Sequence, residues 1–269
     1  MNLGRVKSYL IFLFLAINIY LIVSLVMSFE FRIDDATINN TVEILKSNDI
    51  NIDKSIIPKK AKNLKNIETV NVIYTKDFKN CKYYNDFKLD GNFFSYTEKN
   101  EKLYKKSNSR IAKYVKDFLK DCSFDSQYMK FSNVSENGKT KTLEISCYVK
   151  DYCVFDSRIV ATVTESALIL SGAWHEPQTN SVISNSKTRK TSYITSILID
   201  SCENEAFKNT KEIKKIEFGY LSGALYGNNG HITATALPYY RLTDDKDNVY
   251  YYDATDGTFN SSVSVSNSQ

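Results

Sequence analysis

Residues 107–119 read Ser-Asn-Ser-Arg-Ile-Ala-Lys-Tyr-Val-Lys-Asp-Phe-Leu, and this segment contains a clear helix signal. Its serines can cap a helix, and its apolar side chains recur on one helical face, at Ile111, Val115, Phe118 and Leu119. Strand patterns follow at residues 128–134 and 142–148, with Asn137-Gly138 between them, a strong hairpin signal. Such a helix buries its apolar face on the sheet, so the segment predicts a helix-on-sheet module.

The same order of elements recurs on both sides of this module. An amphipathic helix is expected from a cap at Asp34 or Asp35 to an end near residues 47–49, with apolar positions at Ile38, Val42 and Leu45. Another carries Ile194, Ile197 and Leu198, and strand patterns follow it at residues 215–221, 231–242 and 248–253. We therefore predict an α+β fold with two to three repeated modules, each a helix packed on an antiparallel sheet.

The predicted domain bounds follow from this repeat. Residues 30–105 form a juxtamembrane helix and the first α+β module, residues 106–186 the second module, and residues 187–259 the third. The Ser- and Asn-rich segment 260–269 buries too little apolar surface to order itself and is expected to be a disordered tail.

An N-terminal transmembrane helix is predicted before these modules, because residues 9–29 contain no charge and could cross a hydrocarbon core of about 30 Å. Arg5 and Lys7 precede it, so residues 1–8 are expected in the cytoplasm and the C-terminal domain outside the cell. The expectation is a single-pass protein of the cell membrane. A cleavable signal peptide is the alternative, with Val26-Met27-Ser28 as a weak cleavage site.

The charge of the chain argues against nucleic acid as a partner, and its cysteine content argues against a fully paired set of disulfides. The net charge is +4 and there is no basic stripe interleaved with aromatic residues, so nucleic acid is not an expected partner. The five cysteines cannot all pair within one chain. We expect them to be mostly free and buried. One disulfide, between Cys147 and Cys153, is the alternative.

The sequence contains no recognisable catalytic or metal motif. His175-Glu176 lacks the second histidine of a zincin, and nucleophile-elbow and phosphate-loop motifs are absent. The acids at residues 244–247 lack EF-hand spacing and fit a turn. Residues 219–230 are expected to form a long loop. We predict a protein that is not an enzyme and has no catalytic residue, metal or cofactor.

Three stretches resemble the YycI family. The first is the basic start and apolar run at residues 5–21, and the second is residues 45–53 followed by Pro58. The most specific is Ala-Leu-Pro-Tyr-Tyr-Arg-Leu at residues 236–242, followed by Asn-Val-Tyr-Tyr-Tyr-Asp-Ala-Thr-Asp-Gly at 248–257. The family usually has tryptophan before the arginine, where this chain has Tyr240.

This resemblance implies a membrane-anchored, non-catalytic regulator of a two-component sensor histidine kinase in a Gram-positive bacterium. Members act with a YycH-type partner on the WalK (YycG) kinase and adjust cell-wall homeostasis. The implied transmembrane contact residues are Phe12, Phe14, Asn18 and Tyr20. Asn18 can bond its own helix or contact another transmembrane helix. The alternative function is an extracytoplasmic binding or protease-inhibitor-like module.

Overall fold

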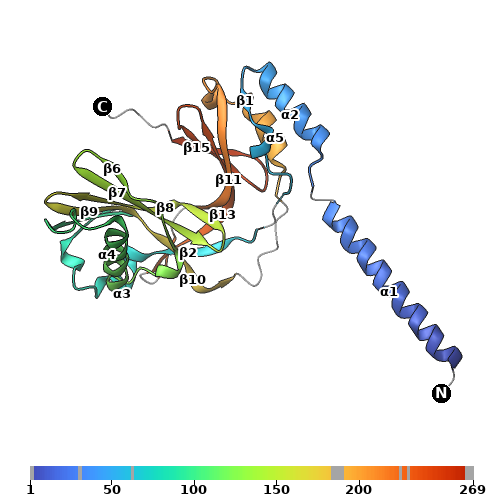
Figure 1. The fold of residues 1–269 in the computed structure, drawn as a ribbon, viewed down its shortest axis with the longest axis horizontal. Coiled ribbons are helices and arrows are strands. Elements are labelled where there is room, and N and C mark those ends of the chain that lie inside the picture. The colour runs from blue at the N-terminus through green and yellow to red at the C-terminus, as the bar shows by residue number, and fades with distance from the viewer. Residues whose placement is uncertain are drawn as a thin grey trace.

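The computed structural model describes residues 3–29, 32–61, 64–182, 191–223, 226–228 and 231–263. Strands dominate the described part of the chain, and they join into a single mixed sheet of 15 strands (Figure 1). The α-helices described are α1 (Leu3–Phe29), α2 (Asp35–Ser47), α3 (Lys76–Lys79), α4 (Asn108–Asp121) and α5 (Ile194–Ser201).

The strands of the first half of the chain are β1 (Asn51–Ile52), β2 (Ile67–Asn71), β3 (Phe87–Asp90), β4 (Phe93–Lys99), β5 (Met129–Phe131), β6 (Ser135–Asn137) and β7 (Thr140–Val149). Those of the second half are β8 (Tyr152–Thr164), β9 (Ala167–Ala173), β10 (His175–Val182), β11 (Glu212–Ser222), β12 (Tyr226–Asn228), β13 (His231–Asp244), β14 (Val249–Asp253) and β15 (Phe259–Val263). The main path through the sheet runs β10-β2-β13-β11-β8-β9-β4-β3.

One hydrophobic cluster lies between α4 and the strands β3, β4, β7, β8 and β9. The predicted apolar face of α4 is fully buried in it, together with aromatic residues of α3 and the β3–β4 hairpin. Burial alternates along β7, so every second side chain enters this core. The helix therefore covers one face of this part of the sheet.

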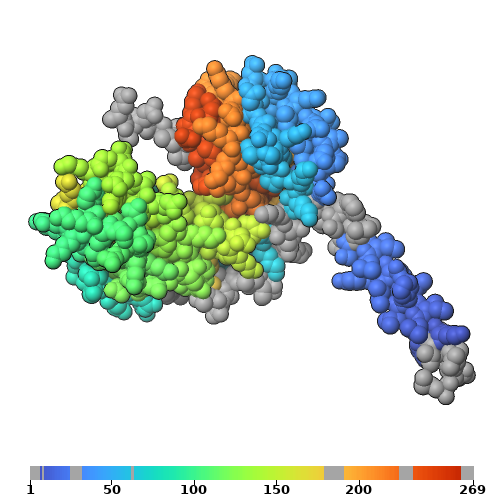
Figure 2. Space-filling view, viewed as in Figure 1, coloured from blue at the N-terminus to red at the C-terminus, as the bar shows by residue number. Residues whose placement is uncertain are grey.

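A second hydrophobic cluster lies under α2 and α5, against β11, β13 and β14. Ile38 and Leu45 of α2 meet Ile197 and Leu198 of α5 in it, and Tyr252 of β14 is buried beside them. In Figure 2 the blue surface of α2 and of the segment that follows it lies beside the orange surface of β11. The early helix thus shares its core with the end of the chain.

The two parts of the sheet are joined through β8 and β11. These strands run parallel and pair at Val154 and Tyr220. The 14-residue β13 pairs with β2 through its first half, and with β11 and β14 through its second half.

The predicted fold class is wrong in two respects, and the first concerns the sheet. Among the described residues, strands from all three predicted modules join the one mixed sheet instead of forming separate antiparallel sheets, and this sheet includes the parallel pairs β1–β11 and β8–β11. Hydrophobic periodicity marks a strand but does not choose its neighbour, so long strands such as β8 and β13 reach partners far away in the sequence.

The second correction concerns the predicted transmembrane helix at residues 9–29. Helix α1 forms and projects away from the sheet (Figure 1), but none of the helices among the described residues is both long and apolar enough to cross a membrane.

Two further expectations meet the structure in part. β11 runs on to Ser222, so the predicted loop at residues 219–230 begins within a strand, and residues 224–225 and 229–230 lie outside the described part. β15 ends at Val263 and so includes the first residues of the predicted tail, whose residues 264–269 are not described.

Candidate functional site

A bulge in β8 lies where the two parts of the sheet join. Ser146 of β7 pairs with Arg158, but the next residue, Cys147, pairs with Val154. The three residues between them on β8, Phe155, Asp156 and Ser157, have no partner in β7. Extra residues of this kind bend a strand and redirect its side chains, as strand bulges do beside many binding sites.

An open cleft with a volume of about 370 Å³ lies beside this bulge. We call it the charged cleft, and it is lined by Lys130, Phe131, Ser132, Glu144, Ser146, Tyr148, Cys153, Phe155, Arg158, Lys215, Glu217 and Arg241. Four of these side chains are cationic and two are carboxylates, so the lining carries a formal charge of 4 − 2 = +2. Apart from Ser132, which directly follows β5, the residues come from β5, β7, β8, β11 and β13, so the cleft depends on the joined sheet.

Arg241 and Glu217 form the fixed centre of the charged cleft. They are direct partners across β11 and β13, and Nε and Nη2 of Arg241 donate hydrogen bonds of 2.9 and 2.6 Å to Oε2 of Glu217. The Arg241 guanidinium also lies 4.4 Å from the centre of the Phe155 ring. Their side chains are 23% and 22% exposed, so the pair is partly shielded from water but reachable from the cleft.

Both members of this pair are charged at neutral pH. Burial acts to raise the pKa of Glu217, but the positive charge of Arg241 and the hydrogen bonds from Lys215 and Arg241 together hold that pKa below its usual value. Burial acts to lower the pKa of Arg241, but Glu217 outweighs it and the pKa is raised. The cleft therefore presents fixed charges to any ligand.

The remaining charges of the cleft are oriented by neighbouring side chains. Nη2 of Arg158 lies 2.5 Å from Oε2 of Glu144, and Nζ of Lys215 lies 2.9 Å from Oε1 of Glu217. Nζ of Lys130 lies 3.9 Å from the centre of the Tyr148 ring. Each of these cations already contacts a carboxylate or an aromatic ring. A ligand would therefore bind in addition to these contacts.

Gly219 allows β11 to approach the bulge closely. A Cβ atom at this position would lie 2.4 Å from the carbonyl oxygen of Cys153 and 2.7 Å from Cζ of Phe155. Real Cβ atoms are not found at such distances from backbone, so only glycine fits without a shift of the chain.

His175 lies at the start of β10 and is buried, with 4% of its surface exposed. Its Nε2 is 3.3 Å from Nδ2 of Asn71, its Nδ1 is 3.5 Å from a carboxylate oxygen of Asp156, and its backbone N–H donates to Ser157. Burial lowers its pKa, although Asp156 acts in the opposite direction. These contacts are those of a packed histidine at a strand end, and His175 does not line the charged cleft. The side chain of His231 lies outside the described residues.

Glu176 is a half-buried carboxyl next to this histidine. It accepts hydrogen bonds of 3.1 Å from Nε1 of Trp174 and from the backbone N–H of Asp125. Burial raises its pKa to about 7. The Glu176 carboxyl therefore links the segment that follows α4, at Asp125, to β10.

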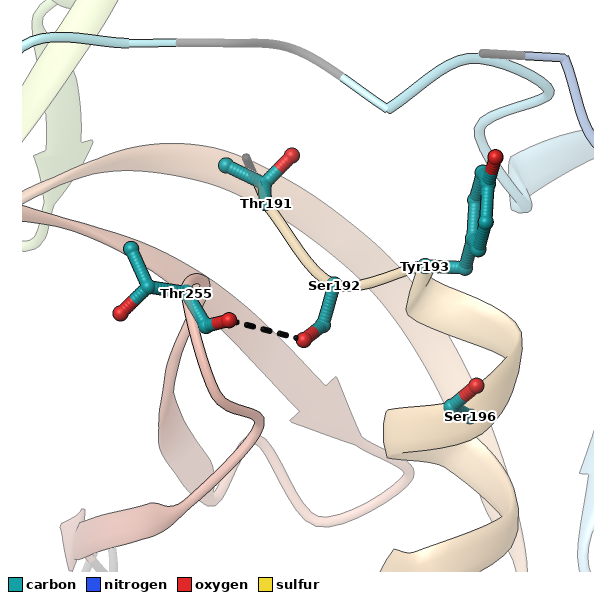
Figure 3. A pocket seen from close by; sticks show the side chains of 5 residues that line it. All are labelled: Thr191, Ser192, Tyr193, Ser196 and Thr255. Atoms are coloured by element: carbon teal, nitrogen blue, oxygen red, sulfur yellow. Dashed lines mark hydrogen bonds between the residues drawn. The ribbon is translucent and has the colours of Figure 1, made fainter. Parts of the chain in front are cut away.

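A second hollow, of about 300 Å³, lies beside the start of α5. It is lined by Thr191, Ser192, Tyr193, Ser196 and Thr255, and Figure 3 shows their hydroxyl groups around it. The Ser192 hydroxyl donates a 3.0 Å hydrogen bond to the carbonyl oxygen of Thr255. No carboxylate, histidine or cationic side chain is among these five, so the hollow has no acid–base pair.

The predicted contact residues all lie on α1, away from the charged cleft. Phe12, Phe14 and Tyr20 are 74%, 70% and 71% exposed. Nδ2 of Asn18 donates a 2.8 Å hydrogen bond to the carbonyl oxygen of Phe14, which is the intrahelical alternative. At about 100° per residue, Phe14 and Asn18 share a face, whereas Phe12 points to the other side, so one partner helix cannot contact all four.

The acids suspected of binding calcium instead form a turn, as expected. The carboxylate of Asp244 accepts hydrogen bonds from the backbone N–H groups of Lys246 and Asn248 and from the Tyr250 hydroxyl. Within the described ranges, no group of three or more His, Cys, Asp or Glu residues could hold a metal ion.

Sequence reasoning did not identify the charged cleft. Arg241 lies in the motif that resembles the YycI family, without a role that the sequence assigns to it, and Glu217 lies within a predicted strand. An arginine in the middle of an otherwise apolar strand pattern is the signal that could have pointed to the cleft.

Comparison with known proteins adds a distant likeness of fold. No family model matches the chain, and no curated protein matches it. An uncharacterized protein from Eubacterium rectale is 11% identical, with 79% of this chain and 90% of that chain covered and a TM-score of 0.43. The Bacillus megaterium YpeB C-terminal domain is 12% identical, with 67% and 82% covered and a TM-score of 0.31.

Proposed function

We propose that this chain is a non-catalytic regulator of YycI type, which acts at the cell membrane on a two-component sensor histidine kinase together with a YycH-type partner. The observation that carries the proposal is the place of Arg241. This residue belongs to the most specific stretch of the resemblance, and it lines an open cleft and not a hydrophobic core. Cell-wall homeostasis is the process that the resemblance assigns to such a regulator.

The charged cleft is the surface that we assign to a protein partner. Its lining carries a formal charge of +2 and includes aromatic side chains, which suits an acidic, extended segment. Fixed cations favour such a segment mainly by guiding its approach and its register. A non-catalytic regulator alters the activity of a kinase only if it binds two conformational states of the kinase with different affinities. A coupling free energy of about 1–3 kcal/mol between them changes signalling severalfold.

The second contact that we propose is the outer surface of α1. The described side chains of its middle turns are apolar and strongly exposed, for example Phe14 at 70% and Ile22 at 60%. An exposed apolar surface of this kind marks a site of contact with another protein surface. Phe14 and Asn18 share one face, and we assign this face to a helix of the kinase or of the YycH-type partner.

Co-purification from membranes tests the proposal with the full chain. Lys215→Glu changes the formal charge of the cleft from +2 to 0, and we expect it to reduce recovery of the kinase and the YycH-type partner about tenfold. Lys113→Glu is the matched control, because it makes the same change on the exposed side of α4. Equal recovery with both variants would refute the assignment of the cleft, and recovery of a protease in place of a kinase would favour the inhibitor-like alternative.

A further inference from the structure

Two cysteines that are 41 residues apart meet at the end of α4. Cys81 follows the short helix α3, and Cys122 is the C-terminal cap of α4. Their Sγ atoms lie 2.6 Å apart. Non-bonded heavy atoms normally stay about 3.5–4.0 Å apart, whereas two bonded sulfurs are about 2.05 Å apart.

Both cysteines are held in place by their surroundings. Cys81 is 8% exposed and Cys122 is fully buried, within the hydrophobic cluster under α4. The backbone N–H of Cys81 donates to the carbonyl oxygen of Phe78, and that of Cys122 to the carbonyl oxygens of Phe118 and Leu119. These bonds fix the backbone positions of both cysteines, so their side chains stay within reach of each other.

The neighbouring residues hold the same two segments together. Nζ of Lys82 lies 3.9 Å from a carboxylate oxygen of Asp121, so each cysteine is next to one member of an ion pair. Around the thiols, the Phe78 ring packs against Phe124 with 5.8 Å between ring centres. Charge and packing both favour the approach of Cys81 to Cys122.

We propose that Cys81 and Cys122 form an intramolecular disulfide when the chain meets a thiol–disulfide oxidant. A thiolate of the protein attacks one sulfur of the oxidant R–S–S–R, which forms a mixed disulfide and releases one R–SH. The second cysteine then displaces the other R–S group. In total the two thiols lose two electrons and two protons, and the oxidant is reduced to two R–SH.

Access and reactivity decide the order of these steps. Burial raises the pKa of the Cys122 thiol, so it is not a thiolate at neutral pH. Cys81 retains some exposure, so the mixed disulfide forms there first and Cys122 resolves it. Oxidation is therefore slow in the folded chain and fast while the chain is folding.

The other cysteines are not placed to pair. Cys147 is paired with Val154 across β7 and β8, and the adjacent Tyr148 is paired with Cys153. Neighbouring positions on a strand face opposite sides, so Cys147 and Cys153 cannot be joined, and the disulfide considered from the sequence is excluded. Cys202 packs against the other hydrophobic cluster.

This inference is independent of any kinase and is tested on the purified full chain. The reduced protein is treated with oxidised glutathione, both folded and during refolding from urea, and the remaining thiols are counted by maleimide labelling. We expect two of the five cysteines to be lost, and a cross-linked peptide that joins residues 81 and 122. The melting temperature should rise by about 10 °C, which is the shift expected for closing a loop of this length.

Three variants complete the test. Cys81→Ala and Cys122→Ala should each abolish the cross-link and the shift in melting temperature, whereas Cys202→Ala should keep both. Peptide mapping of the wild type does not depend on how well the variants fold. Five free thiols after both treatments, or a cross-link that joins any other pair, would overturn the inference.

Discussion

Replacing Arg241 with methionine tests the electrostatic centre of the charged cleft. The change keeps the approximate volume of the side chain but removes two charge-assisted hydrogen bonds to Glu217 and the contact with the Phe155 ring. Glu217, which is 22% exposed, is left without its main partner in a partly dry site.

The expected cost follows from these contacts. Breaking a fully buried ion pair by removing one partner costs about 3–5 kcal/mol, and an exposed pair is worth about 0–1 kcal/mol. With side chains 23% and 22% exposed, the pair lies between these cases, so we expect Arg241→Met to lower the free energy of unfolding by about 2–3 kcal/mol. Much of this cost is the unpaired charge of Glu217, so adding Glu217→Gln should recover about half of it.

Urea denaturation of the four proteins of this double-mutant cycle, in detergent, gives the coupling free energy between the two residues. The pKa of Glu217 is lower in the folded chain than its unfolded value of 4.5. Its contribution to the free energy of unfolding is therefore present above pH 4.5 and is lost as the pH falls through the folded-state pKa. The difference between wild type and Arg241→Met should therefore shrink below about pH 4.5. A cost below about 0.5 kcal/mol, or no recovery in the double variant, would refute the reasoning.

Three other changes test separate parts of the structure. The pKa of Glu176 is raised to about 7 in the folded chain, so its contribution to the free energy of unfolding is complete below about pH 4.5 and is lost by about pH 7. Urea titrations should therefore show that the wild type loses about 3 kcal/mol of stability relative to Glu176→Gln between these pH values. Gly219→Ala places a Cβ against the carbonyl oxygen of Cys153 and should lower stability by about 3 kcal/mol in thermal unfolding, and an unchanged melting temperature would show that the strands separate freely. Asn18→Leu should reduce co-purification of the kinase severalfold without changing the melting temperature, and full recovery would exclude this residue as a contact.

The sequence predicted the elements that depend on local pattern. The helix expected at residues 107–119 is α4 (Asn108–Asp121), because its apolar spacing is contained within one segment; Ser107 occupies the N-cap position, but its side chain makes no capping hydrogen bond. A hairpin also forms there, between β6 and β7 with Gly138-Lys139 as its turn, but the strand predicted at residues 128–134 is represented only by the short β5. Turn chemistry was likewise enough to interpret Asp244.

The joined sheet and the charged cleft could not be predicted in the same way. Both depend on Val154 meeting Tyr220, a pairing across 66 residues that no local periodicity encodes. The bulge in β8 adds three residues that have no partner in β7. An alternating apolar pattern in the sequence does not show where such a bulge interrupts the pairing of two strands. The contact between Cys81 and Cys122 has the same origin, because α4 must first be packed before its end can reach α3.

The central claim is that the charged cleft binds a partner through its excess of positive charge. The most direct measurement is a titration of the purified kinase with the full chain at low and at high salt, compared with Lys215→Glu and Lys113→Glu. The account predicts that wild type and Lys113→Glu bind equally and weaken with salt, while Lys215→Glu binds about tenfold more weakly at low salt and depends less on salt. Equal affinity of all three proteins at low salt would contradict it.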